Sequence, residues 1–140
     1  MTRYGVHALV VLLFLAGLST RPVSGLASPG PAAPDALVAA TEQVDRGKAV
    51  FANHCAKCHG ASGQGGDGPR LIGTPNGLAG YQTAQKLFEF TSAEMPFDNP
   101  GSLKPEEIWD VLAFILDGNR LLPPDAILGP DNAANIRLSR

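Results

Sequence analysis

The chain contains the pentapeptide Cys55-Ala56-Lys57-Cys58-His59, and these residues decide how the rest of the sequence is interpreted. No other cysteine occurs. Two cysteines separated by two residues and followed at once by a histidine form the attachment signature for a c-type haem, in which the thiols bond to the porphyrin. We therefore expect one covalently bound haem c, with Cys55 and Cys58 as its two thioether anchors and His59 as a ligand of the iron.

Two other uses of the same residues fit less well. A structural zinc site needs four ligands, and beyond the N-terminal region only His54 joins Cys55, Cys58 and His59 as a candidate. Those four lie within six residues, which is too short a stretch to surround a tetrahedral ion. A thioredoxin-like dithiol follows a strand, and no strand pattern precedes Cys55.

The first 27 residues have the layout of an export signal. Arg3 supplies a positive charge, and Val6 to Leu18 form a mainly apolar run that is shorter than the roughly 20 residues a membrane-spanning helix needs. Small residues at Gly25 and Ala27 offer a cleavage step. We expect residues 1–27 to be a signal peptide cut near Ala27 and the mature protein to be periplasmic; a cut after Gly25 and an uncleaved anchor are the alternatives.

The size and charge of the remaining chain restrict its class. Residues 28–140 are long enough for one domain and too short for two. They carry 9 Lys and Arg against 13 Asp and Glu, so their formal charge is 9 − 13 = −4. No basic cluster is present, and we therefore expect no nucleic-acid partner.

The region before and after the cysteine motif divides into three segments. Residues 28–40 are rich in proline and alanine and predict a flexible leader. Residues 41–53 contain helix formers and predict a first helix. Residues 60–80 contain eight glycines and two prolines, which predicts a loop that needs a cofactor or another element to hold it.

Two further helices are predicted in the second half. Residues 83–91 form a short candidate, with the Thr83 hydroxyl as its N-terminal cap. Residues 105–118 form the clearest one, because Pro105 suits a first helical position, an apolar stripe follows, and Gly118 suits a helix end. No strand-like alternation of useful length appears, so the predicted fold class is all-α.

Several motifs in order, taken together, resemble the class I c-type cytochromes over about residues 42–118. The resemblance implies a class I cytochrome c fold, in which three to four helices wrap around one covalently bound haem. It places the cytochrome domain at residues 41–118 and leaves residues 119–140 as a C-terminal extension that lies across its own domain or reaches a partner subunit. The resemblance rests on Gly47-Lys48-Ala49-Val50-Phe51, Gly68-Pro69-Arg70-Leu71, Met95-Pro96 and the closing amphipathic helix.

The resemblance also implies the remaining site residues. Met95, the only methionine after the signal region, would give its thioether sulfur to the iron opposite His59. The carbonyl group of Pro69 would accept the hydrogen bond of the histidine ring, and Leu71 would pack on the porphyrin. The alternatives are a methionine that only fills the core and a Pro69 turn that only lies on the surface. His54 precedes the attachment motif directly and is expected to be a partly exposed neighbour.

Similar cytochromes cross their first and last helices where a small residue faces an aromatic one. Gly47 and Phe51 share one side of the first predicted helix, and Phe114 is the expected aromatic of the last helix, with Trp109 as the second choice. Arg70 is expected either to pair with a haem propionate or to be an exposed loop cation.

The resulting prediction is an electron carrier, without a substrate of its own, that exchanges electrons with redox partner proteins. The run from Met95 and the tail from Leu122 to Leu128 look like those of cytochrome subunits that serve periplasmic sulfite- and alcohol-oxidising dehydrogenases. Such a dehydrogenase would be the donor, and another cytochrome or a terminal oxidase the acceptor. The alternatives are a small haem enzyme or gas sensor with a labile methionine ligand, and a structural subunit whose haem is incidental.

Overall fold

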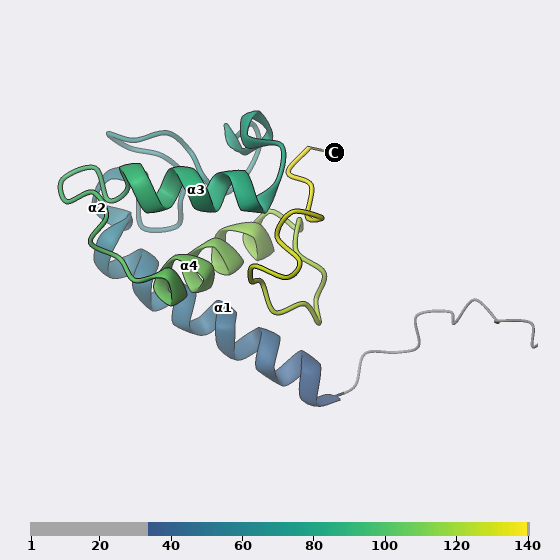
Figure 1. The fold of residues 1–140 in the computed structure, drawn as a ribbon. Helices are drawn as coiled ribbons and strands as arrows, with labels where there is room; N and C mark the ends of the chain where they lie inside the picture. Colours follow the sequence, from purple (N-terminus) through teal and green to yellow (C-terminus); the bar gives the residue numbers. More distant parts are fainter. Residues whose placement is uncertain (1–33, 140) are drawn as a thin grey trace, which may run out of the picture. The chain divides into compact units, whose positions relative to one another are not determined.

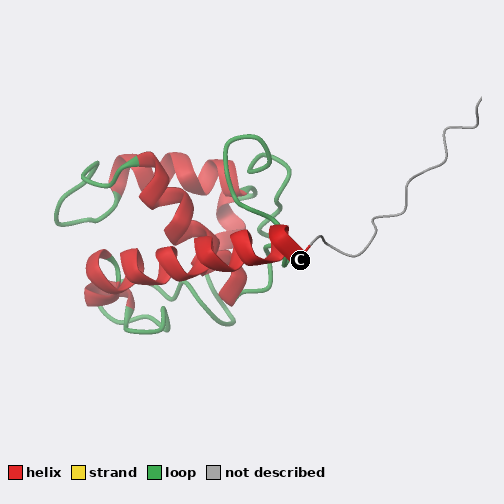
Figure 2. Cartoon of the chain, turned by 90° about the horizontal axis from the view of Figure 1, so that it is seen from below, coloured by secondary structure: helices red, strands yellow, loops and turns green. Residues whose placement is uncertain are grey.

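The computed structural model describes residues 34–139, and that part of the chain is helical throughout its regular structure (Figure 1). No strand occurs in it; Thr83 and Arg137 form one isolated bridge, and Figure 2 shows only helices and loops there. The all-α prediction is confirmed. The expected signal peptide and the first six residues of the expected leader lie outside the described residues. The helices are α1 (Pro34–His54), α2 (Ala56–His59), the 3-10 helix η1 (Leu78–Tyr81), α3 (Ala84–Glu94) and α4 (Pro105–Gly118).

Helix α1 begins at Pro34, seven residues before the predicted start, so the expectation of a flexible leader is wrong for residues 34–40. Pro34 fits a first helical turn, and Asp35 places a negative charge at the positive end of the helix dipole. Ala40 and Gln43 are buried, because this end of α1 packs against the C-terminal extension. That tertiary contact stabilises this part of the helix, and the local composition does not reveal it.

Helices α1 and α4 cross at Gly47. A Cβ atom at this position would overlap the backbone carbonyl of Asp110 and would lie 3.0 Å from the Phe114 Cβ, so only glycine allows the two backbones to come this close. One turn further, the rings of Phe51 and Phe114 lie 5.3 Å apart at 53°. Phe114 is therefore the aromatic of the crossing, as expected. Trp109, the second choice, does not occupy this place.

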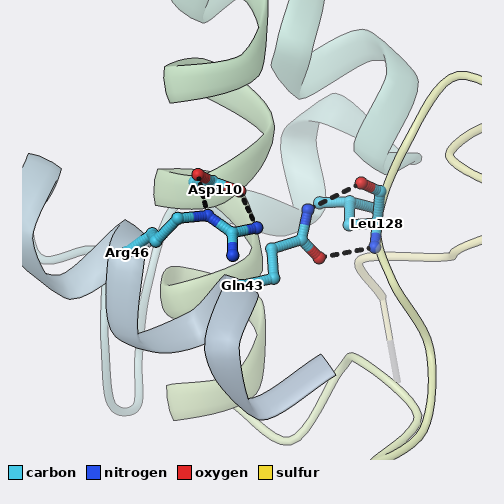
Figure 3. Close-up of polar contacts among 4 residues, drawn as sticks. All are labelled: Gln43, Arg46, Asp110 and Leu128. Atoms are coloured by element: carbon cyan, nitrogen blue, oxygen red, sulfur yellow. Dashed lines mark hydrogen bonds and ion pairs between the residues drawn. The ribbon is translucent and has the colours of Figure 1, made fainter. Parts of the chain in front are cut away.

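An ion pair and a ring stack attach α4 to its two neighbours. Arg46 of α1 donates two hydrogen bonds to the Asp110 carboxylate, at 2.9 and 3.2 Å (Figure 3). On the other side, Trp109 stacks on Phe88 of α3 with ring centroids 3.8 Å apart. Helix α4 therefore lies between α1 and α3 and holds them at fixed positions.

Helix α3 begins where the sequence predicted. Helix α4 both begins and ends at the predicted residues. The Thr83 hydroxyl accepts a hydrogen bond from the Lys86 N–H at 3.3 Å and so caps α3, which continues to Glu94, three residues further than expected. Pro105 is the first residue of α4 and Gly118 its last. The ends of these helices follow from local residue chemistry.

The C-terminal extension lies across its own domain, which is one of the two arrangements that we expected (Figure 1). The Gln43 amide donates to the Leu128 carbonyl at 2.9 Å and accepts from the Leu128 N–H at 2.7 Å (Figure 3). Further along, carbonyls of the extension accept the first two N–H groups of α3. The extension buries four apolar side chains, those of Leu122, Leu128, Ala133 and Leu138.

None of the helices in residues 34–139 combines the length and the apolar character that crossing a bilayer requires.

Candidate functional site

The cysteine motif forms a single helical turn at the end of α1. The Cys55 N–H donates to the Phe51 carbonyl at 2.9 Å, and the His59 N–H donates to the Cys55 carbonyl at 2.9 Å, so the chain passes from α1 into α2 almost without interruption. Both cysteines are half-buried, and no disulfide joins them. Before any haem is attached, burial, and to a lesser extent the neighbouring Cys58, raises the pKa of the Cys55 thiol to about 11.

The imidazole of His59 is buried and held in one orientation. His59 is only 8% exposed, and the Nδ1 atom of its ring lies 2.7 Å from the Pro69 carbonyl oxygen. Because a carbonyl oxygen only accepts hydrogen bonds, Nδ1 must carry the proton. In the neutral ring the other nitrogen, Nε2, then carries the lone pair, and this tautomer is the form of histidine that binds metals. This is the hydrogen bond that the resemblance implied.

Gly68 allows the Pro69 loop to lie directly against that imidazole. The Gly68 N–H donates to the Cys58 carbonyl at 2.8 Å. A Cβ atom at Gly68 would lie 2.9 Å from the His59 Cε1 and 3.0 Å from its Nδ1, closer than side chains approach one another. The glycine is needed for contact with the histidine, so the Gly68-Pro69 segment is more than a surface turn.

One cavity of about 540 Å³ brings the separate segments together. Its volume is within the range of about 300 to 1,000 Å³ that is usual for small-molecule and cofactor sites. All six site residues named from the sequence line it, although they lie on the turn from Cys55 to His59, on the loop after it and directly after α3. Its apolar walls include Leu78, Leu87, Phe90, Val111, Leu112 and Ile115, and the site residues on it are Cys55, Cys58, His59, Pro69, Leu71 and Met95.

Met95 follows the last residue of α3 and is placed by the helix end. Its N–H donates to the Thr91 carbonyl at 3.0 Å, and its side chain is half-buried at the cavity wall. The next residue, Pro96, is buried, whereas Phe97 is 83% exposed and also borders the cavity. The thioether thus lies at the cavity and an unshielded aromatic ring lies at its rim.

Charged groups surround the cavity mouth. Lys57, between the two cysteines, pairs with Asp98 at 3.0 Å and so connects α2 with the segment after Met95. The hydrogen bond and charge of Lys57 lower the pKa of the Asp98 carboxyl, and Asp98 in turn raises the pKa of Lys57. His54 and Arg70 are exposed and border the same cavity. His54 is thus an exposed neighbour of the motif.

Two polar residues that hold other segments in place were not predicted from the sequence. Asn119, just after α4, bonds to the loop that carries Leu71, and Gln43 anchors the extension. Their only sequence signal is a polar amide next to a helix end or within an apolar helix face, which is too common to be diagnostic. Across residues 34–139, no three His, Cys, Asp or Glu side chains are grouped as a metal-ion site would require.

The residues present fit a haem. The cavity has mainly apolar walls, two thiols on one turn, an imidazole with a free Nε2 lone pair and a thioether from a different segment. Imidazole and thioether are both established axial ligands of haem iron, and thiols form the covalent bonds of haem c. A helical domain with such a cavity has the features of a c-type cytochrome.

The comparison with protein families places the chain within this class. Residues 42–115 match the family described as "Cytochrome C oxidase, cbb3-type, subunit III", and the chain belongs to this cytochrome c family. The family has covalently bound haem c and functions in electron transport, and Cys55 and Cys58 provide the expected pair of cysteines.

Three known proteins are similar to this chain in sequence or in structure. The chain is 33% identical over 121 residues to a thiosulfate dehydrogenase of Stutzerimonas stutzeri, covering 80% of this chain and 39% of the relative. It is 29% identical over 79 residues to a cytochrome c-553-like protein of Synechocystis, covering 56% of this chain and 72% of the relative. The sulfane dehydrogenase SoxCD of Paracoccus pantotrophus has a similar structure, with a TM-score of 0.59 and 27% identity over 68% of this chain and 52% of that one.

This chain therefore spans about two-fifths of the thiosulfate dehydrogenase and about half of the SoxCD chain that it resembles.

Proposed function

We propose that this protein is a single-haem electron carrier in which Cys55 and Cys58 would anchor haem c while His59 and Met95 would bind its iron. The observation that supports this most strongly is that all four side chains line the same cavity although Met95 is 36 residues after His59 in the chain. When bound, the haem supplies one-electron chemistry by alternating between ferric and ferrous iron.

The chain's own residues would tune that chemistry. The Pro69 carbonyl fixes the His59 ring and increases the electron density on its Nε2 atom. The Met95 thioether is a soft ligand, which favours ferrous iron compared with a second histidine. Leu71 and the other apolar walls exclude water from the cavity, which disfavours the additional positive charge of the ferric state. Arg70, exposed at the rim, would compensate a propionate charge.

The rim of the cavity is where a redox partner would dock. Phe97 is 83% exposed there, and aromatic side chains are enriched in protein interfaces. Electron-transfer complexes bury little surface, so one exposed ring and a few charges suffice for a brief contact. The excess of acidic over basic residues in 28–140 favours a partner with a basic patch, because opposite charges increase the rate of encounter.

The donor that we propose is a dehydrogenase that oxidises thiosulfate or sulfane sulfur, and the acceptor is another cytochrome or a terminal oxidase. The names of the relatives, thiosulfate dehydrogenase and sulfane dehydrogenase, support this direction in preference to the sulfite or alcohol donors suggested by the sequence. An exported carrier in the periplasm agrees with the signal-like pattern of residues 1–27.

A second candidate, in which this chain itself oxidises the sulfur compound, is favoured by the word dehydrogenase in the relatives' names. One experiment separates the two. The purified ferric protein is mixed without oxygen with thiosulfate alone and with thiosulfate plus a thiosulfate-oxidising dehydrogenase, and the appearance of the ferrous spectrum is timed. Reduction only in the presence of the dehydrogenase supports the carrier. Rapid reduction by thiosulfate alone would show that the chain is an enzyme, and no reduction in either mixture would contradict the proposed donor.

A further inference from the structure

The side chain of Asn119 uses its full hydrogen-bonding capacity directly after α4. Its Nδ2 group donates to the carbonyl oxygens of Leu71 and Ile115, each at 2.8 Å. Its Oδ1 atom accepts from the Gly73 N–H at 3.1 Å and from the Asn76 Nδ2 group at 2.9 Å. A carboxamide has two donor hydrogens and two acceptor lone pairs, so all four are satisfied.

These bonds attach a distant loop to the end of α4. Three of the four partners belong to residues 71–76, and only Ile115 is a sequence neighbour of Asn119. The network continues within the loop, where Asn76 donates to the Gly73 carbonyl at 2.7 Å and accepts from the Leu78 N–H at 3.2 Å. The glycine-rich loop is thus held by a side chain from another element.

That loop is continuous with the support of His59. Leu71 comes two residues after Pro69, whose carbonyl oxygen lies 2.7 Å from the His59 Nδ1 atom. The Leu71 N–H donates to the Gly63 carbonyl at 2.9 Å while its own carbonyl accepts from Asn119, so the residue is held on both sides of its backbone. Leu71 and Ile115 also line the cavity with their side chains.

We propose that Asn119 is a positioning residue which keeps the Pro69 carbonyl against the His59 ring. The inference rests on the proposed role of His59 as an iron ligand. Without the two donor hydrogens of Asn119, the carbonyls of Leu71 and Ile115 lose their side-chain partner, and the loop relaxes. The Pro69 carbonyl then spends less time on Nδ1, and the ring N–H becomes accessible to water.

Asn119→Asp is the most specific substitution, because it keeps the shape of the side chain and replaces its NH2 donor group by a second carboxylate oxygen. A carboxylate would place negative oxygen atoms opposite the carbonyl oxygens of Leu71 and Ile115. Asn132→Asp is a matched control. Asn132 also bonds two backbone groups, accepting from the Gly129 N–H at 3.0 Å and donating to the Ile127 carbonyl at 2.9 Å, but none of these three residues lines the cavity.

The test is the rate at which the Nδ1 proton of His59 exchanges with solvent, measured by NMR on the reduced, haem-loaded protein. We expect the exchange to be at least about tenfold faster in Asn119→Asp than in the wild type and unchanged in Asn132→Asp. Asn119→Ser, which keeps one donor, is expected to give an intermediate rate and replaces the Asp variant if that variant does not fold.

Two results would overturn different parts of the argument. A protected His59 proton in the wild type, together with equal exchange rates in the variants at positions 119 and 132, would overturn the role of Asn119 alone. A wild-type proton that exchanges as fast as that of free imidazole would overturn the orientation of His59 itself, and with it the ligand role on which the inference rests.

Discussion

Replacing Gly47 by alanine tests how the crossing of α1 and α4 supports the cavity. A Cβ atom there would overlap the Asp110 carbonyl oxygen and contact Phe114 at 3.0 Å. A backbone carbonyl within a helix cannot turn aside, so the two helices must separate. Val111, Leu112 and Ile115 of α4 form one wall of the cavity, and their displacement would move this wall away from the turn that holds the cysteines.

The size of the effect follows from two opposing contributions. Alanine stabilises the interior of a helix by about 0.5 to 1 kcal/mol compared with glycine. Overpacking costs about 1 to 3 kcal/mol, and overlap with a backbone atom places Gly47 at the upper end of that range. The net destabilisation is therefore about 2 kcal/mol, which lowers the Tm of a domain of about 100 residues by roughly 8 to 16 °C.

The assay is thermal unfolding of the haem-loaded protein, with Gly80→Ala as the control. Gly80 lies in η1, and a Cβ atom there would have no neighbour within 4 Å, so the same substitution should leave the Tm nearly unchanged. Equal Tm values for the Gly47 and Gly80 variants would contradict this prediction, because they would show that the close approach of α1 and α4 does not restrict the helices.

Three other predictions concern the proposed iron ligand Met95, the contact that anchors the C-terminal extension, and the ion pair at the cavity rim. Met95→Ala should keep its haem but have a lower reduction potential and bind added imidazole; an unchanged ferric spectrum would contradict the ligand assignment. Gln43→Leu should lower the free energy of unfolding by about 2 to 4 kcal/mol in a denaturant titration, because both backbone groups of Leu128 lose their partner. Lys57 holds the pKa of Asp98 below its ordinary value in the folded protein. The ion pair therefore stabilises the fold at a pH above the pKa that Asp98 has in the unfolded chain. This stabilisation is lost as the pH falls through the lower pKa of the folded state. Asp98→Asn should therefore unfold slightly earlier than the wild type at neutral pH and together with it in acid, as followed by circular dichroism; a difference that persists in acid would show another cause.

Local chemistry made much of the fold predictable. Pro105 and Thr83 mark helix starts, because each satisfies or removes N–H groups that the first turn leaves free. The spacing within the cysteine motif also needs only one helical turn, so the anchoring side of the site could be read from five consecutive residues.

The remaining features depend on contacts between residues far apart in the sequence. Gln43 of α1 bonds to Leu128, which lies 85 residues later, and no local pattern indicates that contact. Asn119 similarly acts on a loop more than 40 residues earlier. The meeting of Met95 with the cysteine turn was expected only from the resemblance to known cytochromes, since spacing alone does not bring two segments to one cavity.

Covalent attachment of haem is tested most directly by the mass of the purified protein after denaturation. We expect a polypeptide that is heavier by one haem, with the added mass located on the peptide that contains Cys55 and Cys58. A polypeptide without added mass, with both thiols free or oxidised to a disulfide, would contradict it.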